Sequence, residues 1–459
     1  MTENVCVDIV EKLPVPFGLV RYGVAPDHPE VKNVINSFTH VARDKRCRYF
    51  GNLDVGNDVK IVDLLRSYHA VVLAYGAQAN RKLNVSGETC DGVISASDFV
   101  GWYNGFPQNA NLHLNLNCNT AVVLGHGNVA LDVARMLLTP AQLLEKTDVA
   151  AHALDALKQS SIKRIIIAGR RGPLQVAFTI KELREMVRLP GSRPDLDTND
   201  FIGVPEKISE LPRQRKRLIE LLCKTALEDP GNNETARRQA AQREWNLKFL
   251  HSPVEFESKI IEGVNSLVAV KFEQNRLDGN KAIRTGHTMS IPCGLAIKSV
   301  GYQSVSIDPD IPFDVHKGII PNLCGRVVTP KDSATGLTSG IANTSHVVSK
   351  HYRVIPGLYC SGWIKTGPVG VILTTVNDAL ETAKSIYDDI SGNVLQWDSR
   401  SRNGDVMDQF QKKLVTFSDW MRIDNYEILN GKVSGKPREK IVNVEKMLDV
   451  AFGDNKASK

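Results

Sequence analysis

Two stretches of this chain have residue patterns that bind dinucleotides, and only one of the patterns is complete. Thr120–Leu124 predicts a short buried strand, and the run GHGNVA at residues 125–130 follows it and leads into a helix. In such a turn Gly125 permits a tight bend, Gly127 lets the backbone approach a pyrophosphate, and Ala130 keeps the helix close to the strand. The helix N-terminus adds unpaired N–H groups and a partial positive charge. This stretch therefore predicts a dinucleotide site rather than a purely structural turn.

The second pattern lies at the beginning of the chain. Asp8–Glu11 predicts a strand that ends in an acidic residue, the kind that binds an adenosine ribose. A glycine turn is expected about 20 residues before that acid, whereas only Met1–Val7 come before the strand. We expect a nucleotide site that has its ribose-binding acid and lacks the turn that holds phosphate.

The residues after the next predicted strand indicate which dinucleotide binds. The strand Arg164–Ala168 runs into Gly169, Arg170 and Arg171, where an NAD site usually has an acidic residue. Two guanidinium groups suit a 2′-phosphate, so NADP is favoured, with a solvated arginine pair as the alternative. Arg170 lies further from the glycine turn than the usual spacing of about 20 residues. An extra predicted helix, Asp148–Gln159, accounts for the difference.

Length and composition limit the class of protein. The 459 residues suggest two or three domains, and a net charge of +6 is too mild to indicate nucleic-acid binding. The eight cysteines are scattered without C-x-x-C or zinc spacing, so we expect neither a dithiol centre nor a metal site. No apolar run reaches the length of about 18 residues that spans a bilayer. Met1–Asn4 has no features of a transit peptide, which leaves a cytosolic protein or a targeting segment outside this chain.

Other segments must position these residues. Lys12–Pro29 is rich in proline and glycine, which predicts a shaped loop with a binding role. The remaining predicted elements are a strand at Ala70–Tyr75, a helix at Val129–Leu138, a helix at Leu218–Leu227 preceded by the basic run Arg213–Arg217, short antiparallel strands in Phe249–Val300, and a flexible insertion at Thr329–Tyr352. Asp132 and Glu182 are acids near the nucleotide motifs. Taken alone, they are ordinary carboxylates on helix faces.

Several stretches together resemble the adrenodoxin reductase family, the mitochondrial NADPH:ferredoxin reductases. These stretches are Pro14–Pro29, Gly101–Gly105, Gly125–Arg135, Gly169–Glu185, Cys360–Trp363 and Ser434–Lys440. The resemblance covers nearly the whole chain. It implies an α/β fold with two Rossmann-like domains, arranged as in glutathione reductase. The FAD domain would consist of residues 1–79 and 305–459, truncated by the loss of its first β-α unit, and the NADP domain of residues 80–304 would be inserted into it.

The resemblance also assigns residues to the two cofactors. For FAD, Glu11 would bind ribose, Leu19 and Val55 would contact the flavin nucleotide, and Trp363, Gly370, Val371 and Ile372 would close over it. For NADP, His126, Gly127, Asn128 and Val129 would hold the pyrophosphate, Arg170 and Arg171 the 2′-phosphate, and Glu182 and Gly370 the nicotinamide half. His28 and Asp132 match polar residues near the flavin ring and the nicotinamide. With Glu182 they are the candidate catalytic residues.

The implied reaction is hydride transfer from NADPH to FAD, followed by single-electron transfers to an acidic [2Fe-2S] ferredoxin. Arg184, Arg213 and Arg217 match the surface that docks the ferredoxin, where complementary charge accelerates encounter and fixes orientation. The family places the protein in mitochondria, on the matrix side and peripheral to the inner membrane.

Two departures from the family leave alternatives open. The missing glycine turn removes phosphate-binding amides, and the insertion at Thr329–Tyr352 lies just before the flavin-covering segment. The chain is therefore either a functional reductase or a non-catalytic chain, as a splice variant would be, that binds NADP and ferredoxin but holds FAD poorly. A flavin-free NADP dehydrogenase is a weaker third alternative, because it would leave the Trp363 segment without a purpose.

Overall fold

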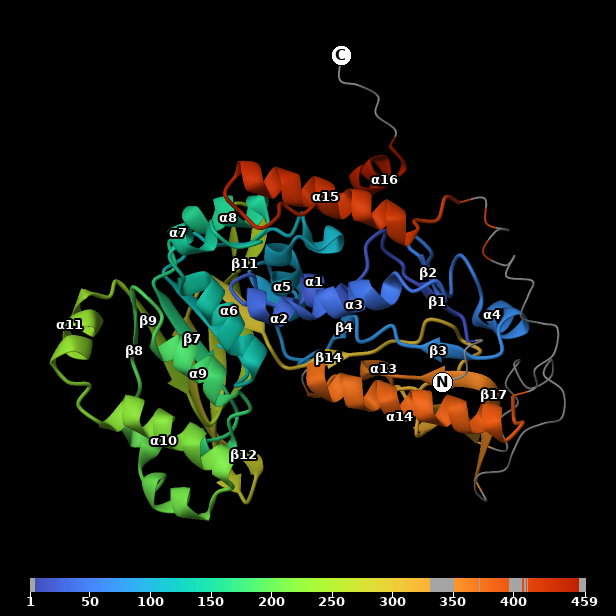
Figure 1. Ribbon diagram of the computed structural model, residues 1–459. Helices are drawn as coiled ribbons and strands as arrows, with labels where there is room; N and C mark the ends of the chain where they lie inside the picture. The colour runs from blue at the N-terminus through green and yellow to red at the C-terminus, as the bar shows by residue number, and fades with distance from the viewer. Residues whose placement is uncertain are drawn as a thin grey trace.

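The computed structural model describes residues 5–330, 351–370, 372–395, 407, 410 and 412–453. Its elements form two α/β units that lie side by side in Figure 1. The central unit contains the elements from β5 to β13, residues 93–298. The terminal unit contains β1 to β4 and the elements from β14 onward, and so combines the two ends of the described chain.

The central unit is built on a six-stranded parallel sheet. Its strands, in spatial order, are β5 (Val93–Ser95), β13 (Leu295–Lys298), β6 (Thr120–Leu124), β7 (Arg164–Ala168), β9 (Arg243–Lys248) and β8 (Ser192–Pro194). The middle strands β6 and β7 are almost completely buried, which explains why they are continuous apolar runs in the sequence.

Each face of this sheet has its own cover. Ala121, Val123 and Ile165 point into a core made with helices, whereas Val122 and Ile166 pack in a separate core against the three-stranded antiparallel sheet. The helices are α5 (Ala96–Asn104), α6 (Asn128–Leu138), α7 (Ala141–Leu144), α8 (Ala151–Lys158), α9 (Ile180–Val187), α10 (Arg213–Leu227) and α11 (Asn232–Ala240). The antiparallel sheet consists of β10 (His251–Ile261), β11 (Val264–Asp278) and β12 (Lys281–Pro292). The alternation follows from the period of two in a strand.

The terminal unit has two smaller sheets. One pairs β1 (Val7–Val10) in parallel with β2 (Cys47–Phe50), and the other has the order β15-β16-β17-β3. The strands of the second sheet are β15 (Asn322–Leu323), β16 (Arg326–Pro330), β17 (Tyr352–Cys360) and β3 (Val71–Leu73). The helices of this unit are α1 (Gly18–Tyr22), α2 (Pro29–Lys32), α3 (Val34–Ala42), α4 (Ile61–Ser67), α13 (Trp363–Thr366), α14 (Ile372–Ser391), α15 (Phe417–Val433) and α16 (Val444–Phe452). A short antiparallel ladder of β4 (Ala79–Asn80) and β14 (Tyr302–Gln303) lies where the chain passes between the units.

The two sheets of the terminal unit meet at unpaired strand edges. Tyr68, just after α4, donates a hydrogen bond of 2.6 Å to Asp8 on β1 and so links the two sheets. Within the described residues β1 pairs only with β2 and β3 only with β17, and Val7, Ile9 and Val72 are 50%, 40% and 43% exposed.

Several sequence expectations about elements need correction. The predicted helix Asp148–Gln159 begins later, at Ala151, because the Asp148 carboxylate is used by two lysines rather than by the helix. The strands in Phe249–Val300 are not short, since β11 alone has 15 residues, and β13 joins the parallel sheet instead of an antiparallel pair. The helix predicted at Leu218 already begins at Arg213.

The insertion predicted at Thr329–Tyr352 is also narrower than expected. Thr329 pairs with Arg353, and Pro330 pairs with Tyr352, so both ends of the segment belong to an antiparallel ladder. Residues 331–350 lie outside the described residues.

The C-terminal segment holds the two units together through buried charges. Figure 1 shows α15 running above both units. Glu427 on α15 is fully buried, pairs with Arg21 from α1 and accepts the backbone N–H of Ile441 at 2.9 Å. Farther along, the Lys440 ammonium lies 3.1 Å from the Asp148 carboxylate of the central unit. None of the described helices is long and apolar enough to cross a membrane.

Replacing Glu427 by Ala should lower the midpoint of urea unfolding. The change leaves the Arg21 guanidinium buried without its carboxylate, and breaking a buried ion pair in this way costs about 3 to 5 kcal/mol. The matched control on the same helix is Leu429→Ala, because Leu429 is 62% exposed. Equal midpoints for the two variants would show that the pair does not support the fold.

Candidate active site

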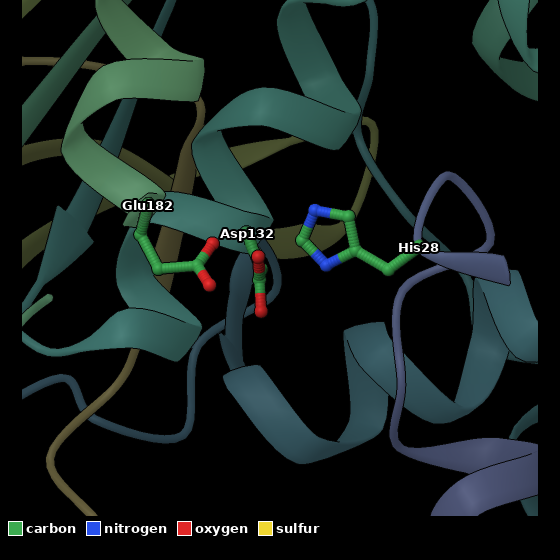
Figure 2. A group of neighbouring side chains, drawn as sticks. All are labelled: His28, Asp132 and Glu182. Carbon is green, nitrogen blue, oxygen red and sulfur yellow. The ribbon is translucent and has the colours of Figure 1, made fainter. Parts of the chain in front are cut away.

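Three side chains that the sequence analysis predicted to be catalytic meet between the two units. His28 comes from the loop before α2, Asp132 from α6 and Glu182 from α9. Figure 2 shows the imidazole and the two carboxylates pointing toward one another. One potential ligand atom from each of the three lies within 4.8 Å of the others. Residues separated by more than 100 positions are thus brought into one cluster.

A residue absent from the predictions, Arg135, lies at the centre of this cluster. Its guanidinium bonds to Asp27 at 2.7 Å through Nε and to Asp132 at 2.8 Å through Nη2. Its Nη1 donates to Glu182 and to Glu185, in each case at 3.2 Å. Arg135 is only 3% exposed. One buried cation therefore contacts four carboxylates.

Burial and charge act in opposite directions on these groups. Burial raises the pKa of Asp132 despite the attraction of Arg135. Burial also raises the pKa of Glu182, and the negative charge of Asp132 adds to the rise. For Asp27, burial favours the neutral form, but Arg135 outweighs it and lowers the pKa. Asp132 and Glu182 thus take up a proton more readily than Asp27 does.

Local helix structure explains how the cluster is assembled. Asp132 and Arg135 are three residues apart on α6, as are Glu182 and Glu185 on α9, so each pair shares one helix face. Thr179 caps α9 through a hydrogen bond from the Glu182 N–H. Ion pairs across the units then close the array, with His28–Glu185 at 2.7 Å and Lys181–Glu30 at 2.9 Å.

A cavity opens beside the cluster. Its volume is about 430 Å³, and its lining residues are Asp27, His28, Glu30, Arg135, Arg184, Glu185, Arg188, Leu189 and Pro190. The donor atoms of His28, Asp132 and Glu182 are close enough to share a metal ion. Arg135 already bonds to both carboxylates, however, so the contacts are those of an ion-pair network.

The glycine turn has the geometry expected of a dinucleotide site. Gly125 has φ +131°, and a Cβ there would lie 2.2 Å from the Ser299 carbonyl oxygen, so only glycine fits. A Cβ at Gly127 would meet no atom within 4 Å, which leaves room for a phosphate group. Gly127 precedes α6 and provides no side-chain cap, and Ala130 is fully buried against the sheet. These features fit a pyrophosphate at the N-terminus of α6.

His126, in contrast, has its side chain directed inward. Its Nε2 bonds to the Ile167 carbonyl oxygen at 2.9 Å, and its ring packs against Phe249 at 4.9 Å between centroids. Burial lowers the pKa of His126 to about 4, so the ring is neutral at pH 7. The His126 side chain therefore adds no positive charge to the turn, and only its backbone faces the turn. Asn128 is also engaged, because its Oδ1 accepts the N–H of Thr179.

The predicted 2′-phosphate residues Arg170 and Arg171 lie at the end of β7. Their carbonyl groups are held by Asn275 and by the N–H of Leu250, which fixes the backbone. The Arg170 side chain is exposed and that of Arg171 is half-buried, so both remain accessible to a ligand. Arg215, from the basic run, lies near enough for the charge of Arg171 to add to the effect of burial in lowering its pKa. The site therefore has more positive charge than the sequence motif alone indicated.

The predicted flavin residues form only part of a site. Burial raises the pKa of Glu11, whose carboxylate accepts the N–H of Leu13 at 3.1 Å. Trp363 stacks on Tyr302 with 5.6 Å between centroids, and Leu19 is 46% exposed. These positions fit the ribose and the ring cover, but the described residues around β1 contain no glycine turn for the phosphates.

Four further predicted flavin positions give less information. Val55 packs at the edge of two hydrophobic cores. Gly370 has φ +90°, in the region that favours glycine. Val371 lies outside the described residues, and Ile372 is described only as the first residue of α14.

The predicted docking arginines lie on two neighbouring helices. Arg184 is on α9, Arg213 and Arg217 are on the neighbouring helix α10, and all three side chains are exposed. Arg184 also lines the cavity beside the His28 cluster. A partner that contacts these residues would thus lie close to the candidate active site.

The sequence analysis missed Arg135, Asp27 and Glu185. A usable signal was present for two of them, since Arg135 follows Asp132 by three residues and Glu185 follows Glu182 by three. On a helix this spacing places each pair on the same face. No such local signal connects Asp27 to Arg135, because that contact depends on how the two units pack.

Comparisons with known proteins give consistent results. The chain is 50% identical to "NADPH:adrenodoxin oxidoreductase, mitochondrial" of Salvelinus fontinalis over 454 residues, which cover 98% of this chain and 86% of that protein. It is 48% identical to the protein of the same name from Homo sapiens over 451 residues, covering 96% and 86%. No protein-family model matches the chain.

A bacterial relative with a solved structure extends the comparison. NADPH-ferredoxin reductase FprA of Mycobacterium tuberculosis is 37% identical over 465 residues, covering 98% of this chain and 93% of that protein. The structure of FprA in complex with NADPH has a TM-score of 0.85 at 36% identity and covers 99% of this chain and 94% of that chain. This chain therefore belongs to the NADPH:adrenodoxin oxidoreductase family of mitochondrial, FAD-dependent oxidoreductases, which use NADP(H) and have an adrenodoxin-type ferredoxin as partner.

Proposed function

We propose that this chain takes hydride equivalents from NADPH and delivers electrons one at a time to an acidic [2Fe-2S] ferredoxin. The observation that carries the proposal is the meeting of His28, Asp132 and Glu182 between the glycine-turn unit and the terminal unit. A nicotinamide that extends from the N-terminus of α6 would reach this cluster. The relatives named above act on NADPH and on adrenodoxin or ferredoxin, which supports the same reaction here.

The residues of the chain would bind and orient the nicotinamide cofactor. Gly127 and the N-terminus of α6 would hold the pyrophosphate, and Arg170 with Arg171 would hold the 2′-phosphate. Glu182, Asp132 and His28, which point toward one another in Figure 2, would lie at the nicotinamide end. A bound flavin would supply the conversion of a hydride into single electrons, while the protein provides orientation and electrostatics.

The proposal includes a division into domains and a cellular location. The flavin domain would consist of residues 1–79 and 305–459, and the NADP domain of residues 80–304. The β4–β14 ladder at Ala79–Asn80 and Tyr302–Gln303 supports these boundaries, because the chain crosses between the units there. The family is mitochondrial, and within mitochondria we place the chain on the matrix side, peripheral to the inner membrane.

A second proposal concerns how the polypeptide of these 459 residues behaves by itself. The unpaired edges of β1 and β3 and the lack of a described glycine turn near Glu11 favour weak retention of FAD. Such a chain would bind NADP and ferredoxin and have little activity. The glycine turn at 125–130 and the docking arginines would be unaffected.

The visible absorption spectrum of the purified chain distinguishes these two proposals. We expect flavin absorbance well below one flavin per chain, because the described residues around β1 offer no glycine turn or helix N-terminus to stabilise the phosphates. Added FAD should raise the flavin content of the chain. A stoichiometric flavin spectrum directly after purification would contradict weak retention and would leave the functional reductase as the description of this chain.

Replacing Arg170 and Arg171 by Ala should change cofactor preference. Each lost charge-assisted contact to the 2′-phosphate should weaken NADP binding, by about 10- to 100-fold for the pair, while NAD binding changes little. Calorimetry with both nucleotides measures the effect. The control Arg66→Ala removes an exposed arginine of α4 in the other unit. Equal losses for NADP and NAD would exclude the 2′-phosphate assignment.

Reversing the charge of Arg213 and Arg217 to Glu should raise the KM for ferredoxin by about tenfold or more at low salt. Reduction of a small artificial acceptor by the same enzyme should not change, since it needs no docking. Both assays should be run with saturating FAD. Lys281→Glu on β12 is a matched control for an exposed charge elsewhere. A parallel fall of both activities would show that α10 contributes to something other than docking.

A further inference from the structure

The cluster between the two units contains more negative charge than its cation can neutralise. Asp27, Asp132, Glu182 and Glu185 all contact the single guanidinium of Arg135. Four ionised carboxylates and one arginine by themselves carry a net charge of −3. Such an excess is expensive in a partly buried site unless it meets a positive ligand. The oxidised nicotinamide ring carries a positive charge.

We propose that Arg135 is a positioning residue that holds Asp132 and Glu182 in place for the nicotinamide cation and favours their ionised forms against the effect of burial, while it fixes Asp27 of the terminal unit to the same array. The inference rests on the proposed function, because it takes the cluster as the nicotinamide end of the NADP site. It adds a residue and a determinant of pH dependence that the sequence patterns did not indicate.

The geometry makes Arg135 suited to this role. Its Nη2 contacts Asp132 at 2.8 Å, and its Nη1 contacts Glu182 at 3.2 Å, so the two carboxylates are held by separate nitrogens of one planar group. Nε donates to Asp27 across the boundary between the units. Lys has one ammonium and cannot reproduce this fork.

The other groups around Asp132 do not replace Arg135. Charged and titratable neighbours come from every packed element: Asp27 and His28 before α2, Lys181, Glu182 and Glu185 on α9, Tyr103 on α5 and Tyr302 on β14. Burial raises the pKa of Tyr103 and, with the charge of Asp132, raises that of Tyr302 to about 12, so both phenols stay neutral near pH 7. Lys181 is directed to Glu30 and Glu185.

Loss of Arg135 should therefore move the pH range of nicotinamide binding. An opposite charge in contact lowers a carboxyl pKa by about 1 to 3 units, and its removal raises the pKa by the same amount. Asp132 and Glu182 would then be protonated at pH values where the native cluster is ionised. The attraction for the nicotinamide cation would disappear at a higher pH than in the native chain.

The experiment compares NADP⁺ with 2′,5′-ADP, which has the 2′-phosphate and lacks the nicotinamide. Calorimetry between about pH 5 and pH 8 gives the affinity for NADP⁺ divided by the affinity for 2′,5′-ADP. This ratio reports the contribution of the nicotinamide end alone. In the native chain we expect the ratio to fall toward acid pH. In Arg135→Gln the fall should occur about one pH unit higher or more. This readout needs neither flavin nor turnover.

Two further variants make the result specific. Arg135→Lys keeps the charge, so the pH at which the affinity ratio falls should shift less than in Arg135→Gln. The Lys variant also keeps the test usable if the Gln variant folds poorly. Arg188→Gln removes an exposed arginine that lines the same cavity, and it should leave the pH of the fall unchanged. Unchanged binding of 2′,5′-ADP in all variants shows that the fold and the phosphate site are intact.

Two outcomes would contradict the inference, and a third would contradict the proposed function. If the fall occurs at the same pH in Arg135→Gln as in the native chain, Arg135 does not set the ionisation of the cluster and the inference is wrong. It is also wrong if affinity for 2′,5′-ADP declines in step with NADP⁺. Failure of the native chain to bind 2′,5′-ADP would instead contradict the proposed function itself.

Discussion

The arrangement of this protein depends on one buried guanidinium. Arg135 projects from α6 of the central unit and contacts carboxylates of α9 and of the segment before α2, so it joins the glycine-turn unit to the terminal unit where the candidate catalytic residues meet. A buried cation is stable only if its donors are used, and each nitrogen of Arg135 has a carboxylate partner. The positions of Asp132 and Glu182 are therefore not independent properties of two helices. They follow from the requirement to satisfy one side chain.

Buried charges recur elsewhere at the boundary between the units. The Lys440 ammonium has its pKa lowered to about 7 by burial, and the neighbouring Asp148 has its pKa lowered to about 2 by Lys440 and Lys32 in spite of burial. The directions agree with a carboxylate held ionised by two cations, one of which is almost out of contact with water. Ion pairs of this kind contribute little net stability when complete, yet removal of one partner is costly. They fix which surfaces of the two units meet.

The sequence predicted local structure well and contacts between the units poorly. The strands Thr120–Leu124 and Arg164–Ala168 were predicted with their observed bounds because a strand buried on both faces is a continuous apolar run. The glycine turn was predicted because its chemistry is local. The spacing from Asp132 placed Arg135 on the same helix face, but its burial and its contact with Asp27, 108 residues away along the chain, depend on how the units pack, so Arg135 was missed. For the same reason the start of α8 was predicted at Asp148, whereas the helix begins at Ala151. The Asp148 carboxylate bonds to lysines that are distant along the chain.

The unpaired edges of β1 and β3 also have a consequence for the behaviour of the chain in concentrated solution. An exposed strand edge presents free N–H and C=O groups, and proteins usually protect such edges with charges, proline or a covering element. Here the edge strands carry the β-branched residues Val7, Ile9 and Val72 at the surface. β-branched side chains favour the extended conformation and packing between strands. Self-association and aggregation of this polypeptide should therefore begin at these edges of the terminal unit, where β-branched side chains are exposed.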